Sequence, residues 1–174
     1  MNQSLIKLIA QNAHTITKMR EEVEQASKNQ ALDPNAWKKA TETFQNSYDR
    51  LAFPGGLTAG LALLQKGDPS TIEIAITYLK ANPYFFRSGY IKGTIARLLK
   101  QVMLSSQQVQ ELQNILLDTI STSGKEYREY CRLACKIATE DFRNRLQEYI
   151  NQAPDKSITQ KAQNMLDALP KSKL

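Results

Sequence analysis

The chain has 174 residues, of which 41% are hydrophobic, and it carries a net charge of +6 at pH 7. This length and composition fit one globular domain with a sizeable core, and they exclude a disordered or collagen-like chain. The basic excess either favours an acidic partner, such as an acidic protein or a nucleic acid, or serves solubility alone.

The first predicted helix runs from Ser4 to about Lys28, a stretch without Gly or Pro within residues 1–30. Its apolar positions alternate in steps of four and three, as in a coiled-coil seam with one polar residue that sets the register. The seam consists of Leu5, Ile9, Asn12, Ile16, Met19, Val23 and Ala26. Two interpretations stay open: the helix covers the rest of the domain, or it pairs with a second copy of the chain.

A second helix is predicted from Pro34 to Ala52, because Asp33 supplies a capping side chain and Pro34 fits the first helical turn. One face of this helix carries Trp37, Ala40, Thr41, Phe44, Tyr48, Leu51 and Ala52. The tetrapeptide Phe53–Gly56 stops the helix. We interpret it as a tight turn rather than a phosphate-binding loop, because it lacks the preceding strand and the lysine of such a loop.

Two short helices are predicted next. Residues 57–66 form a strongly apolar helix, and Gly67 fits the left-handed residue that ends it. Asp68 and Pro69 repeat the cap and first-turn signature and open the following helix. Its core face is expected to carry Ile72, Ala75, Ile76 and Leu79.

The stretch Asn82–Gln101 joins two helices through an aromatic loop. Pro83 is expected to stop the first helix by keeping the preceding residue out of the α conformation, and Ser88 to cap the second with its hydroxyl. The aromatic run Tyr84–Phe86 cannot point inward as a whole from so short a turn, so at least one ring is exposed or plugs a gap between layers. The polar face of the second helix carries Lys92, Arg97 and Lys100.

Four further helices are predicted. Ser105 starts one that ends by Gly124, and Thr139 caps another that Pro154 ends. Ser157-x-x-Gln160 indicates a capping box before the last helix. The helix between Gly124 and Thr139 has a basic face made of Lys125, Arg128, Arg132 and Lys136, with Glu129 beside it.

Helix pairs of similar length recur in residues 67–170: Gly67–Gln101, Ser105–Thr139 and Glu140–Pro170. Their second helices are predicted to start at Gly89, Gly124 and Ser157, at offsets of 35 and 33 residues. This pattern resembles HEAT-like repeats, in which antiparallel helix pairs stack and the second helices line a concave surface. The resemblance implies a single all-α domain with a short right-handed array, and a closed up-and-down helical bundle is the alternative.

The residues that usually carry catalysis are sparse. His14 is the only histidine, and Cys131 and Cys135 lie four residues apart on one predicted helix, so neither a metal site nor a cofactor is expected. No segment reaches the ~18 uncharged apolar residues of a membrane span, and the first residues lack the apolar segment of a leader peptide. The chain is therefore expected to be a cytoplasmic protein and not an enzyme.

The candidate binding residues lie on the two basic helices and the aromatic loop: Arg87, Tyr90, Lys92, Arg97, Lys100, Lys125, Arg128, Arg132 and Lys136. If the two helices are neighbours in an array, their basic stripes run ~10 Å apart and form one patch. The sequence favours a protein-binding module, such as an adaptor, assembly or immunity-type factor with an acidic partner. The alternatives are a nucleic-acid-binding HEAT-like protein and a structural protein that self-associates through the Leu5–Ala26 seam.

Overall fold

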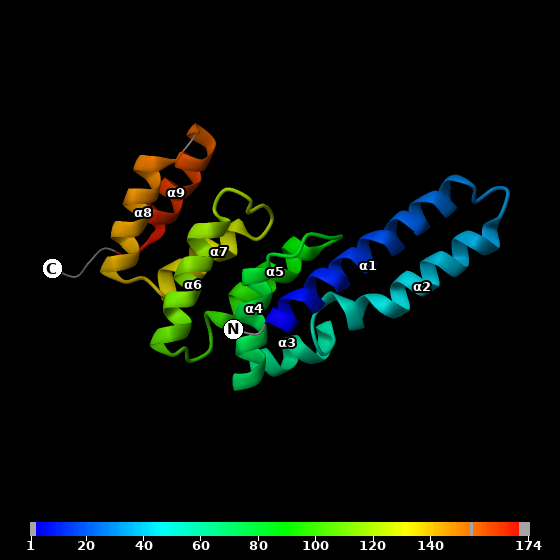
Figure 1. The fold of residues 1–174 in the computed structure, drawn as a ribbon, viewed down its shortest axis with the longest axis horizontal. Helices are drawn as coiled ribbons and strands as arrows, with labels where there is room; N and C mark the ends of the chain where they lie inside the picture. The colour runs from blue at the N-terminus through cyan, green and yellow to red at the C-terminus, as the bar shows by residue number, and fades with distance from the viewer. Residues whose placement is uncertain (1–2, 154, 171–174) are drawn as a thin grey trace. The chain divides into compact units, whose positions relative to one another are not determined.

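The computed structural model describes residues 3–153 and 155–170, and over these residues the protein is all-α, with nine helices and no strand. Figure 1 traces the helices in chain order. Where the sequence predicted one domain, the contacts divide the chain into two compact units, residues 1–88 and residues 89–174. The boundary falls inside the predicted repeat Gly67–Gln101, so its two helices belong to different units.

The first unit contains α1 (Gln3–Lys28), α2 (Pro34–Ala52), α3 (Leu57–Gln65) and α4 (Pro69–Ala81). The first two helices form a long antiparallel hairpin (Figure 1). α4 packs against α1 and α3, and α3 also contacts α2. These bounds agree with the predicted helices to within one or two residues.

Two aspartates cap helices of this unit as predicted. Asp33 accepts a hydrogen bond from the backbone N–H of Ala36 at 3.0 Å, and Asp68 accepts one from that of Thr71 at 2.8 Å. Asn82 ends α4 in the left-handed conformation, with φ 44° and ψ 53°, rather than the extended one that the following proline suggested. Asparagine tolerates this conformation better than most residues, and its N–H bonds the last carbonyls of the helix.

The cap at Asp68 makes the stability of the first unit depend on pH. The hydroxyls of Ser70 and Thr71 donate to its carboxylate and lower the pKa of Asp68 below its ordinary value. A carboxyl with a lowered folded-state pKa stabilises the fold above its unfolded pKa of about 3.9, and this contribution disappears as the pH falls through the folded-state pKa. We expect Asp68→Ala to lower the urea midpoint at neutral pH but not at strongly acidic pH. An equal effect at both would contradict the assignment.

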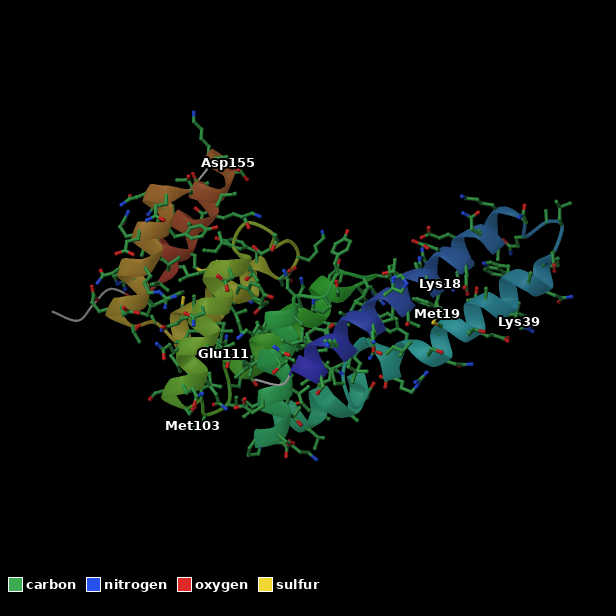
Figure 2. The ribbon with its side chains drawn as sticks, in the orientation of Figure 1. Lys18, Met19, Lys39, Met103, Glu111 and Asp155 are labelled. Atoms are coloured by element: carbon green, nitrogen blue, oxygen red, sulfur yellow. The ribbon has the colours of Figure 1, made fainter. Side chains whose placement is uncertain are left out.

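The predicted seam of α1 packs within the chain. Ile9, Ile16 and Val23 are buried, and α1 contacts α2 and α4. Figure 2 shows Met19, another seam residue, between α1 and α2, whereas Lys39 of α2 points away from α1. The seam is therefore occupied by the chain's own helices, and a second copy would have to bind another face of the hairpin.

The second unit contains most of α5 (Ser88–Leu99), which begins at the boundary, and α6 (Ser106–Thr119), α7 (Tyr127–Lys136), α8 (Glu140–Gln152) and α9 (Lys156–Ala168). The first helices of the last two pairs, α6 and α8, contact each other, and so do the second helices, α7 and α9. Stacked helix pairs make contacts of this kind. The right-handed HEAT-like array and the closed bundle both stay predictions.

The helix starts in this unit agree with the sequence in two cases. Ser105 and Gln108 form a reciprocal capping box, with hydrogen bonds of 3.2 and 2.8 Å, and the Thr139 hydroxyl accepts from the N–H of Phe142 at 3.1 Å. Both caps lie next to the first helical residue, where sequence signals for a helix start are strongest.

The predicted capping box of the last helix is wrong. Asp155, labelled at the start of α9 in Figure 2, accepts from the N–H groups of Ser157 and Ile158 at 2.8 and 2.9 Å. Gln160 instead bonds Asn164. A carboxylate two residues earlier in the chain is the better acceptor for the first free N–H groups. The predicted stop at Pro154 lies outside the described residues.

α7 begins at Tyr127, later than the predicted start after Gly124. The N–H of Tyr127 donates to the Gly124 carbonyl at 3.2 Å, which closes a turn over the two residues between them. Lys125 and Glu126 therefore precede the helix. This turn directs the Glu126 side chain into the interior of the second unit.

Candidate binding surfaces

The backbone of the loop at residues 83–87 of the first unit is held by two side-chain hydroxyls from outside the loop. The N–H of Phe85 donates to the hydroxyl of Ser88 at 3.1 Å, and the Tyr48 hydroxyl donates to the carbonyl of Phe86 at 2.8 Å. Ser88 is the first residue of α5, and its oxygen binds the loop instead of the helical N–H groups that we expected it to cap.

The three aromatic rings of this loop have different environments. Phe85 is buried, whereas Tyr84 is 91% exposed and Phe86 is 44% exposed. The prediction that at least one of the three rings is not packed inward is confirmed. The guanidinium groups of Arg20 and Arg87 lie 4.8 and 5.9 Å from the centre of the Phe86 ring, within the range of cation–π attraction.

The second unit carries four exposed cations at helical spacing, here called the basic row: Lys125, Arg128, Arg132 and Lys136. The last three lie on α7, and Lys125 lies in the turn before it. Glu129 accepts a hydrogen bond from Arg132 at 2.6 Å. Among the described residues, the other three members of the row make no ion pair, so most of its charge faces solvent.

Lys92 does not belong to the exposed candidate residues. It is only 5% exposed and forms an ion pair with Glu126, itself 3% exposed, at an Nζ–Oε1 distance of 2.7 Å. The helical wheel placed Lys92 on the polar face of α5, but the turn before α7 covers that position. The ion pair with Lys92 also balances the charge of the Glu126 carboxylate.

Two glycines of α5 lie against this turn, and the closer contact is at Gly89. A Cβ atom on Gly89 would lie 2.9 Å from Oε2 of Glu126, and one on Gly93 would lie 3.6 Å from the Glu126 Cα. A larger residue at position 89 would displace the carboxylate that Lys92 binds. The spacing of four residues between the glycines was the one sequence signal that this face of α5 is a contact surface.

The other candidate residues lie in both units. Arg87, in the first unit, is exposed, as are Tyr90 and Arg97 of the second unit, while Lys100 is half-buried. Arg97 donates to the hydroxyl of Thr94 at 3.1 Å. That the cations of α5 and the basic row form one patch stays a prediction.

Two tyrosines and one cysteine of α7 have pKa values above their ordinary ones. Burial raises the pKa of the Tyr130 phenol, and the Glu126 charge raises it further. Burial also raises the pKa values of Tyr127 and Cys131, whose side chains interact with each other. Raised pKa values make these groups poor nucleophiles near neutral pH.

The tight turn at residues 53–56 leads into a helix start that binds a carboxylate of the chain itself. The carboxylate of Asp49 accepts from the N–H and the hydroxyl of Thr58 at 2.9 and 2.5 Å, so it already occupies the N-terminus of α3. Among the residues that the structure describes, no group of three acidic, cysteine or histidine side chains is arranged to hold a metal ion. No helix within the same ranges has the length and apolar character to cross a bilayer.

No family model, curated protein or solved structure matches the chain. The HEAT-like resemblance therefore stays a prediction.

Proposed function

We propose that the chain is a non-enzymatic protein-binding module that uses the basic row to bind an acidic partner protein. The proposal rests on one observation: around α7, within the described residues, the carboxylates are paired with cations, whereas most of the cations are exposed and unpaired. Its two neighbouring carboxylates are engaged, Glu126 by buried Lys92 and Glu129 by Arg132. The cations of the row stay exposed.

The spacing of the row favours a charged partner over simple solubility. Neighbouring side chains three or four residues apart on a helix lie about 5–6 Å apart, less than the ~8 Å Debye length at physiological salt. Their potentials therefore add. A solubility surface mixes both signs, whereas here the row is interrupted only by Glu129. An acidic helix or loop of another protein would complement it.

A nucleic acid would also be attracted to this row, but four cations on a single helix and the turn before it make a short phosphate-binding track. The two classes of partner differ in their response to salt, because the release of counterions makes nucleic-acid binding fall steeply as salt rises. A titration with nucleic acid at two ionic strengths therefore tests this alternative.

We expect a partner protein to copurify with the wild-type chain from its native host and to be lost from the variant Arg128→Glu/Lys136→Glu. Reversing two exposed charges leaves the core intact, so the variant should keep its helical circular dichroism. Lys156→Glu, an exposed change on α9 of the same unit, is the matched control and should retain the partner. Loss of the partner from both variants, or from neither, would contradict the proposal. Tight binding of duplex or single-stranded DNA that weakens steeply with salt would favour the nucleic-acid alternative.

A further inference from the structure

The α1–α2 hairpin leaves much of its apolar surface partly uncovered. Among the residues of α2, only Ala52 is buried, and the predicted core positions Trp37, Phe44 and Tyr48 are only half-buried. The turn between the two helices and the adjoining helical turns extend beyond α3 and α4 of the same unit (Figure 1). Two helices alone cannot enclose an apolar stripe, which is why helical hairpins usually pack against further helices.

Four charges line one side of this hairpin. Arg20 binds Glu24 at 2.9 Å, and Lys38 lies 4.0 Å from Glu42, so each pair shares a face of its own helix. Arg20 directly follows Met19 of the α1 seam, and Lys38 directly follows Trp37 of the apolar face of α2. In an antiparallel pair such positions lie on the same side. The partly exposed ring of Phe86 lies on this side too, against Arg20 and Phe44.

The four charges lie at symmetric positions about the turn, and the two charges of each symmetric pair have opposite signs. Glu24 and Lys38 each lie seven residues from Ala31. Arg20 and Glu42 each lie eleven residues from it. At each of the two levels, one helix of the hairpin carries a positive charge and the other carries a negative charge.

We propose that a second copy of the chain covers this side, with the two hairpins packed as a four-helix bundle about a two-fold axis parallel to the helices. The rotation brings α1 of one copy beside α2 of the other at the same level. Arg20 then faces Glu42 of the second copy, and Glu24 faces Lys38. A two-fold interface must be self-complementary, and these four residues meet that requirement without a foreign chain. The half-buried stripe and Phe86 supply the apolar centre. This surface lies in the first unit and does not depend on the proposed function of the basic row.

Two measurements on the full chain test the dimer. Trp37 is the only tryptophan and belongs to the half-buried stripe, so its emission reports directly on this surface. We expect sedimentation equilibrium to show a monomer–dimer transition between ~1 µM and ~1 mM, the range in which a weak interface is populated. Trp37 emission should shift to the blue over the same range. A monomer mass throughout, with emission that does not depend on concentration, would overturn the proposal.

The adjacent lysines of α2 provide a matched pair of variants. Lys38→Glu places like charges opposite each other at two symmetric positions and should raise the dissociation constant of the dimer about tenfold. Lys39→Glu changes the same charge on the outward side of α2 (Figure 2) and should leave the constant unchanged. Equal weakening by both variants would contradict the geometry.

A variant with exchanged charges distinguishes an effect on the interface from an effect on the stability of the helices. The double variant Glu24→Lys/Lys38→Glu restores opposite charges between copies, although it places like charges four residues apart within each helix. We expect it to dimerise as the wild type does. If it stays as weak as Lys38→Glu while its circular dichroism remains helical, these charges do not meet across a two-fold interface.

Discussion

Replacing Lys92 with alanine is expected to destabilise the second unit by about 3–5 kcal/mol, because the change leaves the Glu126 carboxylate buried without its cation. Both side chains are almost fully buried, and their charged atoms are 2.7 Å apart. An exposed ion pair contributes only about 0–1 kcal/mol, so the size of the loss tests the burial itself. For a unit of this size, the melting temperature should fall by more than about 10 °C.

A double variant identifies the cause of that loss. Replacing Lys92 with methionine and Glu126 with leucine removes both charges and keeps most of the volume, so the stability should return to within ~1 kcal/mol of the wild type or exceed it. Trp37, the only tryptophan, lies in the first unit, so its fluorescence does not report directly on the second unit. Unfolding of the second unit should therefore be followed by circular dichroism. If the double variant is as unstable as Lys92→Ala, the loss comes from the geometry of the turn and not from an unpaired charge.

The helix boundaries of the first unit could be predicted because the responsible interactions are local. Asp33 and Asp68 cap N–H groups three residues away, and Gly67 ends α3 with φ 76°. Such signals lie within one helical turn and leave few alternatives. The error at α9 had the same origin: Asp155 and Ser157 both suit a cap, and sequence spacing does not choose between neighbouring acceptors.

The burial of Lys92 could not be predicted because its cause lies 34 residues away, at Glu126. A helical wheel reports the direction of a side chain relative to its own helix and contains no information about which segment covers that direction. The basic row could be predicted because its spacing is a local property of α7 and the turn directly before it. A merged patch depends on how α5 and α7 cross, which side-chain patterns do not specify.

The approach of α3 to the end of α2 depends on Gly60. A Cβ atom at this position would lie 2.5 and 2.6 Å from Cδ1 and Cε1 of the Phe53 ring. Carbon atoms in ordinary contact are ~3.5–4.0 Å apart, so the ring would have to move. Phe53 is fully buried, and its ring centre lies 5.3 Å from that of buried Tyr78, which blocks a simple displacement.

Gly60→Ala is therefore expected to destabilise the first unit by about 1–3 kcal/mol, although alanine is the better helix former by ~1 kcal/mol. Urea unfolding followed by Trp37 fluorescence measures the effect in the unit where it arises. Gly93→Ala is the matched control, because a Cβ atom there would be no closer than 3.6 Å to its neighbours. That variant, followed by circular dichroism, should gain ~0.5–1 kcal/mol from helix propensity. If both substitutions stabilise the protein, Phe53 does not pack against Gly60, and the contact between α2 and α3 is looser than the structure indicates.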